Sequence, residues 1–267
     1  KLGRVGETAG RIEDAAAGAI DARRHNPYLG GMPLSAAPGT RFDGMTPVKA
    51  GAIGYVQHID MQALSKLAER IGGEIHLLLN PGAFVYRDTT IAYLDAPARE
   101  PHEDLEPEKA AGRALTIGNE RSFDQDPRFG LVVLSETAQR ALSPAVNDPG
   151  TAIDVIGRAT RLLSRWAEPV DSQEPQFANV FIPALKADDL FEDAFMAIAR
   201  DGAAQVEIQL RLQKSLAALT RLGDGDFRTA ARRQAALALS RAEKALPIEA
   251  DFQRLQDDLG DRPSPAV

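Results

Sequence analysis

Charged and polar side chains gather in two neighbouring stretches of the chain, residues 121–126 and 136–151. The residues that could contribute to one polar site there are Arg121, Asp124, Asp126, Glu136, Arg140, Ser143, Asn147 and Asp148. Glu136 and Arg140 are four residues apart, so on a helix they share a face and can form an ion pair. Free amides at the start of a helix after Asp148 attract an anion, although the Asp148 carboxylate competes for them. This pattern predicts a pocket for a polar ligand, or for a reaction, at the 121–126 and 140–151 corner.

The segment ALSPAVNDPGTA, residues 141–152, also has a purely architectural interpretation. Pro144 lacks an amide hydrogen and disfavours helix at the residue before it, so a helix should end near Leu142. Asp148 followed by Pro149 is typical of a helix N-cap and first helical position. In this interpretation the polar side chains serve only to stop one helix and start the next.

Other kinds of chemistry have little support in the sequence. The absence of cysteine excludes disulfides, thiolate metal sites and cysteine nucleophiles. The four histidines are isolated in sequence, and strand spacing places His58 and His76 on adjacent strands, where histidines are mostly structural. Phosphate-binding glycine loops and the serine-nucleophile motif are also missing. We therefore predict no metal, no cofactor and no catalytic residue, with an enzyme kept as the alternative to a binding module.

Composition limits the fold and the partners. The 267 residues, 44% of them hydrophobic and 26% charged, are enough for one large domain or two small ones with a buried core. The net charge of −7 argues against nucleic-acid binding, because phosphate contacts need clustered lysine and arginine. No run approaches the roughly 20 apolar residues that a membrane-spanning helix needs.

The elements that must position the candidate site are expected to be mostly strands in the first half of the chain and helices in the second half. We expect a juxtamembrane helix and linker over residues 1–46, a β-rich module over 47–122, a helical domain over 123–260 and a disordered tail over 261–267. The helical domain is expected to be a bundle of about five helices, since each of its segments carries an apolar stripe. The predicted fold class is therefore α+β.

Local signals give more detail in the β-rich module. Asp60 is typical of an N-cap, and the helix after it should end at Gly72-Gly73. Strands are expected over residues 74–80 and 83–95, joined by a turn that contains proline and glycine. The acidic, proline-rich stretch 96–112 is expected to be an exposed loop.

Three ordered blocks of the sequence resemble a family of predicted bacterial membrane proteins, domain-of-unknown-function family 2254. They are GYVQHIDMQALSKLA, NPGAFVYRDTTIAYL and RSFDQDPRFGLVVLSETAQRALSPAVNDPGTAIDVIGR. Asn80 and Ala83 stand where the family pattern has arginine and aspartate, so a role that depends on those two residues is not carried over. The middle block is also faintly similar to the turn of barrel-sandwich, or hammerhead, biotinyl and lipoyl domains. No lysine for such a cofactor lies near Phe84–Leu94, so this similarity concerns the fold.

The family resemblance implies a topology and no reaction. Its members have several N-terminal membrane spans followed by a soluble region, and this chain is expected to be that soluble region. It then lies at the bacterial inner membrane, on the cytoplasmic side, attached through the spans. We expect a homo-oligomeric regulatory or assembly module for the membrane portion, serving transport of a small solute or ion.

Overall fold

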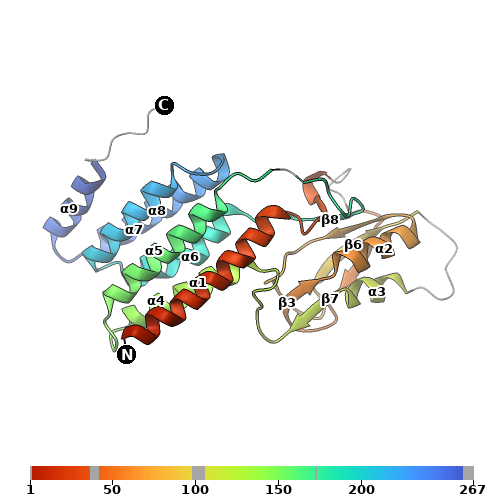
Figure 1. Ribbon diagram of the computed structural model, residues 1–267, viewed down its shortest axis with the longest axis horizontal. Coiled ribbons are helices and arrows are strands. Elements are labelled where there is room, and N and C mark those ends of the chain that lie inside the picture. Colours follow the sequence, from red (N-terminus) through yellow and green to blue (C-terminus); the bar gives the residue numbers. More distant parts are fainter. Residues whose placement is uncertain (1, 37–41, 98–105, 172, 261–267) are drawn as a thin grey trace. The chain divides into compact units, whose positions relative to one another are not determined.

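The computed structural model describes residues 2–36, 42–97, 106–171 and 173–260, so the predicted tail lies outside the described residues. The protein is α+β, as predicted, and it divides into two compact units (Figure 1). The helical unit comprises Lys1–Asp21, Gly130–Pro169 and Lys186–Val267. The mixed unit comprises Ala22–Phe129 and Val170–Leu185. Each unit has a hydrophobic core of its own.

The helical unit is built from amphipathic helices around one core. Its helices are α1 (Leu2–His25), α4 (Pro127–Leu142), α5 (Pro149–Trp166), α6 (Ala187–Asp201), α7 (Val206–Leu219), α8 (Gly225–Ala245) and α9 (Glu249–Gly260). The last residues of α1 and the first of α4 belong to the mixed unit. The largest fully buried side chains of this core are Ile20, Leu131, Leu134, Ile156, Leu162, Phe191 and Phe195. Burying each of them stabilises the fold by roughly 1.5–3 kcal/mol.

Helix α1 is held to α5 by ion pairs as well as by apolar contacts. The Glu13 carboxylate accepts hydrogen bonds from Nη1 of Arg158 at 2.7 Å and from Nε of Arg161 at 2.6 Å. Arg165 donates from Nε and Nη2 to the Asp21 carboxylate at 2.6 and 2.5 Å. These pairs fix the rotation of α1 so that its apolar stripe faces the core.

The mixed unit contains two sheets and two helices. Its elements are β1 (Met32–Pro33), the 3-10 helix η1 (Leu34–Ala36), β2 (Thr46–Lys49), β3 (Gly54–Ile59), α2 (Met61–Ile71), β4 (Glu74–Leu77), β5 (Phe84–Val85), β6 (Thr90–Asp95), α3 (Pro107–Arg113), β7 (Leu115–Gly118) and β8 (Val180–Ile182). The five-stranded sheet has the order β1-β8-β4-β6-β2, and the three-stranded sheet the order β5-β3-β7. Among the described strands neither sheet closes into a barrel.

Alternation along β4 decides which side chains enter the core of the mixed unit. Ile75 and Leu77 are fully buried, and their partners on β6 are Leu94 and Ala92. This apolar face belongs to the same core as the buried residues of α2. His76 points to the opposite face, because successive side chains on a strand alternate. The N-cap of α2 is Asp60, as predicted, and it accepts a hydrogen bond from the Ala63 amide at 2.9 Å.

Two expectations for this unit were wrong. Residues 83–95 are not one strand: β5 and β6 belong to different sheets, because a turn separates them. In that turn the Thr89 amide donates to the Tyr86 carbonyl, and the Thr89 hydroxyl accepts from the Tyr86 amide. His58 and His76 consequently do not lie on adjacent strands, since β3 and β4 are also in different sheets.

The stretch 96–112 is not wholly a loop, although residues 98–105 of it lie outside the described part. It contains most of α3, which begins at Pro107, where the fixed φ of proline suits a first helical turn. Ala111 on this helix is fully buried in the core of the mixed unit. The proline and glutamate residues predicted a loop, so the short helix and the packing of Ala111 against the core were not expected. The predicted linker is also partly structured, since β1 pairs in parallel with β8.

Candidate functional site

The corner between α4 and α5 has the caps that the sequence predicts. Helix α4 ends at Leu142, and Asp148 is the N-cap of α5. Its Oδ1 accepts from the Thr151 amide at 3.1 Å, and its Oδ2 from the Thr151 hydroxyl at 2.6 Å. These two hydrogen bonds hold the pKa of Asp148 below its ordinary value. The preceding Asn147 has a left-handed backbone with φ of 47°, which reverses the chain.

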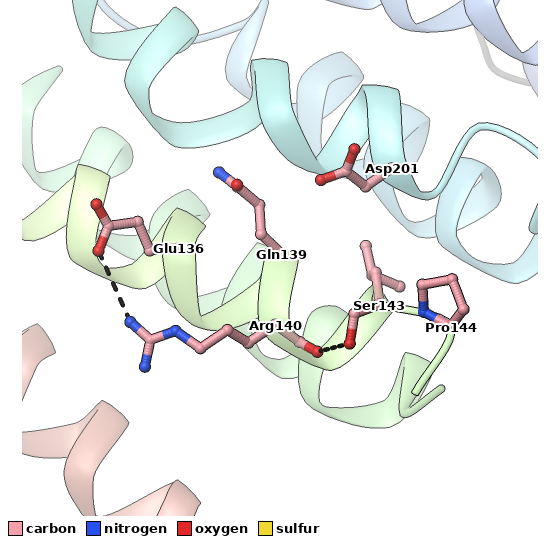
Figure 2. A pocket seen from close by; sticks show the side chains of 7 residues that line it. Glu136, Gln139, Arg140, Ser143, Pro144 and Asp201 are labelled. Carbon is pink, nitrogen blue, oxygen red and sulfur yellow. Dashed lines mark hydrogen bonds and ion pairs between the residues drawn. The ribbon is translucent and has the colours of Figure 1, made fainter. Parts of the chain in front are cut away.

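A pocket of about 640 Å³ opens beside this corner, within the helical unit (Figure 2). Its lining residues are Glu136, Gln139, Arg140, Leu142, Ser143, Pro144 and Asp201. Glu136 and Arg140 point toward one another at one end, and Asp201 of α6 lies at the other end (Figure 2). Three of the predicted residues line the pocket, namely Glu136, Arg140 and Ser143, whereas Asn147 and Asp148 are not part of its lining.

The pocket carries charges of both signs on exposed side chains. Arg140 and Glu136 form the predicted ion pair, with Nη2 and Oε2 separated by 3.8 Å. Asp201 accepts from its neighbour Arg200 at 2.6 and 3.0 Å. The Ser143 hydroxyl donates to the Arg140 carbonyl at 2.7 Å, so its proton is not directed toward a base. The lining therefore supplies donors and acceptors for a small polar molecule, without an activated nucleophile.

Arg121 and Asp126 form a buried pair in the mixed unit. Nε and Nη2 of Arg121 donate to Oδ2 of Asp126 at 2.8 and 2.7 Å, and the Arg128 amide donates to Oδ1 at 3.1 Å. The side chain of Asp126 is 2% exposed and that of Arg121 is 16% exposed. Burial raises the pKa of the Asp126 carboxyl, against the charge and hydrogen bonds of Arg121. The Arg121 guanidinium also lies 5.4 Å from the centre of the Phe129 ring.

Arg23 extends this pair into a network that we call the Arg121–Asp126 node, comprising Arg23, Asn80, Arg121, Gln125 and Asp126. Arg23 donates from Nη1 to Oδ1 of Asn80 at 2.9 Å and from Nη2 to the Gln125 carbonyl at 3.0 Å. Burial lowers the pKa of Arg23 to about 10, opposed by the charge of Asp126, so the guanidinium is protonated at neutral pH.

Gln125 ties the node to the end of β3. Its Nε2 donates to the Ile59 carbonyl at 3.2 Å, and its Oε1 accepts from the Ile59 amide at 2.8 Å. Nδ2 of the Asn80 side chain donates to the Pro183 carbonyl at 2.9 Å. The node thus joins α1, the turn after β4, the end of β3 and the segment after β8. These four segments of the mixed unit are therefore connected by buried polar contacts as well as by the core.

Gly82 leaves room for the node, because a Cβ at this position would lie 2.2 Å from Oδ2 of Asp126. Its φ of 93° is also in the left-handed region that favours glycine. Asp124 lies outside the buried network, where it contacts Nδ1 of the exposed His58 at 2.7 Å. Arg121, Asp124 and Asp126 are thus placed in the mixed unit, and the other predicted site residues in the helical unit. One pocket shared by both groups stays a prediction.

Comparison with known proteins places these features in a family. The family model described as "Predicted membrane protein (DUF2254)" matches residues 1–218. The chain belongs to this family. Uncharacterised proteins of Mycobacterium bovis and Mycobacterium tuberculosis are 28% identical to it over 215 residues, which cover 77% of this chain and 41% of each relative. The chain thus spans about two fifths of the length of these relatives. No solved structure matches it significantly.

The DUF2254 match includes both the Arg121–Asp126 node and the α4–α5 corner. Members of the family are described as predicted membrane proteins. Within the described residues of this chain, every helix is too short or too polar to cross a membrane.

Sequence reasoning missed three residues of these sites, Gln139, Asp201 and Arg23. Gln139 follows Glu136 by three positions on α4, so helical spacing could have found it. Asp201 and Arg23 come from distant helices and have no local signal.

Proposed function

We propose that this chain is a self-associating extramembrane module that assembles and regulates the membrane portion of a DUF2254 protein. It works at the cytoplasmic face of the inner membrane, in support of the passage of a small solute or ion. The membrane setting is supported by the family description. The self-association is supported by one observation on the mixed unit, an exposed face of large apolar side chains at the edge strand β5.

This face, which we call the β5 aromatic face, consists of Tyr55, Phe84 and Tyr86, and the exposed Ile53 directly precedes β3 in the sequence. Tyr55 and Phe84 are cross-strand partners with ring centres 4.9 Å apart, and the rings of Phe84 and Tyr86 are 5.4 Å apart. Ile53, Phe84 and Tyr86 are 54%, 47% and 59% exposed. Contiguous aromatic side chains at a sheet edge are typical of a protein contact, because they bury large areas at little entropic cost.

A second copy of the chain fits this face better than a lipid surface does. Binding to anionic lipid relies on lysine and arginine around the apolar residues, whereas this chain carries a net charge of −7. The outer edge of β5 offers backbone groups that a two-fold related β5 could pair with, and the aromatic rings would then pack across the same axis.

Sedimentation velocity over a concentration series tests the proposal. The expected result is a reversible dimer whose dissociation constant rises at least tenfold in Phe84→Ser. Leu237→Ser is the matched control, because Leu237 is an exposed apolar residue on α8 in the other unit. A chain that stays monomeric at every concentration, or equal weakening by both variants, would overturn the self-association. Binding to anionic vesicles that Phe84→Ser abolishes would assign the face to lipid instead.

The pocket between α4 and α6 supports a second candidate, the binding of a small polar solute. Arg140 and Glu136 offer a donor and an acceptor that are only loosely paired, at 3.8 Å. Thermal unfolding in the presence of small carboxylic acids, amines and amino acids should reveal a stabilising compound. Arg140→Gln should remove that stabilisation, whereas Arg233→Gln, at an exposed pair with Asp188, should not. If no compound raises the melting temperature, the pocket is not a binding site for these classes.

A further inference from the structure

His76 is a buried histidine without a hydrogen-bond partner among the described residues. Its side chain is 1% exposed, and within that part of the chain neither Nδ1 nor Nε2 has a partner in hydrogen-bonding geometry. The nearest carboxylate oxygen, Oε2 of Glu74, lies 3.5 Å from Nε2, where the geometry does not make a hydrogen bond. Burying a polar group without a partner is unfavourable, so such an atom in a folded protein requires a physical explanation.

Two carboxylates lie beside the imidazole on the same face of the five-stranded sheet. Glu74 precedes His76 by two residues on β4, so both side chains point to one face. Asp95 on β6 is the direct cross-strand partner of Glu74. One ligand atom from each of the three residues lies within 4.8 Å of the other two.

The carboxylate pair is itself unfavourable without a cation. Like charges placed directly opposite each other on neighbouring strands destabilise a sheet. In the part of the chain that the structure describes, no lysine or arginine forms an ion pair with Glu74 or Asp95. Among the described residues, this arrangement combines an unpaired buried polar group with two opposed like charges. Arrangements that break such stability rules mark functional sites.

Aromatic side chains hold the His76 ring in one orientation. The ring stacks on Phe181 of β8, with centres 5.0 Å apart and planes 7° apart. Phe42 meets its edge at 6.3 Å and stacks in turn on Tyr93 at 4.4 Å. An imidazole held in one orientation by its neighbours is preorganised to bind a metal ion.

We propose that His76, Glu74 and Asp95 bind one divalent transition-metal ion of the Zn²⁺ class. The ligands are Nε2 of His76 and one carboxylate oxygen from each acidic residue. A cation at this position supplies the missing partner of the imidazole and neutralises the two opposed carboxylates. The site is independent of the proposed self-association, since it lies on the five-stranded sheet and the β5 aromatic face lies on the other sheet.

The ligand set selects the class of metal. One imidazole nitrogen with two carboxylate oxygens suits Zn²⁺ and similar ions, whereas Mg²⁺ and Ca²⁺ prefer six or more oxygen ligands. The Glu74 side chain is 38% exposed and Asp95 is also exposed, so both can rotate to reach the metal–ligand distances of about 2.0–2.2 Å. The same exposure gives the ion a path to His76 and leaves a coordination position for water.

Calorimetric titration of the metal-free whole chain with a zinc salt alone tests the site. The expected result is saturable binding of one ion per chain. Glu74→Gln and Asp95→Asn should each weaken it at least tenfold, and His76→Phe should abolish it. His58→Gln is the matched control, because His58 also contacts a carboxylate, that of Asp124, but in an exposed pair. A second readout is the nitrogen NMR spectrum of the histidine rings, in which zinc should shift His76 and leave His58 unchanged.

The variants separate the proposal from loss of folding. Phenylalanine at position 76 can keep the stack on Phe181, and circular dichroism checks that it does. If His76→Phe nevertheless fails to fold, the two partly exposed carboxylate variants decide the question alone. Absence of saturable zinc binding would overturn the site. So would binding that survives Glu74→Gln and Asp95→Asn, or that is weakened equally by His58→Gln.

Discussion

Replacing Asp126 by asparagine should destabilise the mixed unit far more than any exposed substitution near it. Asparagine keeps the shape of the side chain but removes the charge that two buried arginines face, Arg121 and Arg23. Asparagine has an NH₂ group in place of one of the two carboxylate oxygens. If the NH₂ takes the place of Oδ2, it faces the two Arg121 donors; if it takes the place of Oδ1, the hydrogen bond from the Arg128 amide is lost. The variant therefore leaves buried donors without acceptors as well as unneutralised charge.

The magnitude follows from burial. Removing one partner of a buried ion pair costs about 3–5 kcal/mol, because the remaining charge stays desolvated. Arg121 is 16% exposed and can regain some water, which places the expected loss near 3 kcal/mol. With a urea dependence of roughly 1.5–3 kcal/mol per molar, the unfolding midpoint of the mixed unit should fall by about 1–2 M.

Hydrogen exchange measured by mass spectrometry along a urea series can follow this unit separately, through peptides that contain Gly54–Ile59 of β3. The matched control is Asp124→Asn, two residues away, whose partner His58 is exposed and whose loss should cost less than about 1 kcal/mol. Equal midpoints for Asp126→Asn and Asp124→Asn would refute the node as the structural centre of this unit. They would also reopen the buried carboxylate as a functional group.

Three further predictions concern packing, glycine geometry and pH. Phe195→Ala should cost the helical unit about 3–5 kcal/mol, because Phe195 is fully buried, and the fluorescence of the single tryptophan, Trp166, should report the earlier unfolding. Gly82→Ala should cost at least about 2 kcal/mol, and in a double-mutant cycle its effect should overlap with that of Asp126→Asn, since both disturb one contact. Burial raises the pKa of Glu13, but Arg161 and Arg158 outweigh it, so the folded-state pKa is lowered and its stabilisation is lost as the pH falls through that value. Glu13→Gln should therefore cost about 1 kcal/mol at pH 7 and progressively less as the pH is lowered below about 4, measured as urea midpoints of Trp166 fluorescence; a difference that stays constant over that range would contradict this.

Local signals predicted the helix ends well. The stop at Leu142 and the cap at Asp148 depend only on neighbouring residues, and both are found in the structure. The α+β class followed from the strand-like and helix-like segments along the chain, and the family from three short sequence blocks; both predictions are confirmed. The turn at Tyr86–Thr89 was missed because Tyr86 and Thr89 are common in strands and outweighed the turn signal of Asp88. The structure reveals the turn because β5 and β6 lie in different sheets.

Distant partners could not be predicted from one sequence. Arg23 contacts residues 57 and 102 positions away, and no periodicity encodes such a pairing. Glu74 and His76 could be placed on one face by strand alternation, but Asp95 joins them only through the register of β4 and β6. His76 was expected to be structural because it is isolated in sequence and histidines on a strand face are mostly structural. The joint pocket at residues 121–151 depends on two units, and spacing along the chain says nothing of their arrangement.

The place of β8 has a consequence for how the protein is made. This strand comes from residues 180–182 and pairs in parallel with both β1 and β4, which were synthesised about 100 or more residues earlier. Before β8 has emerged from the ribosome, β1 has no partner strand in the five-stranded sheet, and the edge of β4 that pairs with β8 is open. The mixed unit therefore completes its sheet only after α1, α4 and α5 have left the ribosome, because β8 follows all three in the sequence. During that interval a chaperone, or a neighbouring nascent chain, can occupy the open edge of β4.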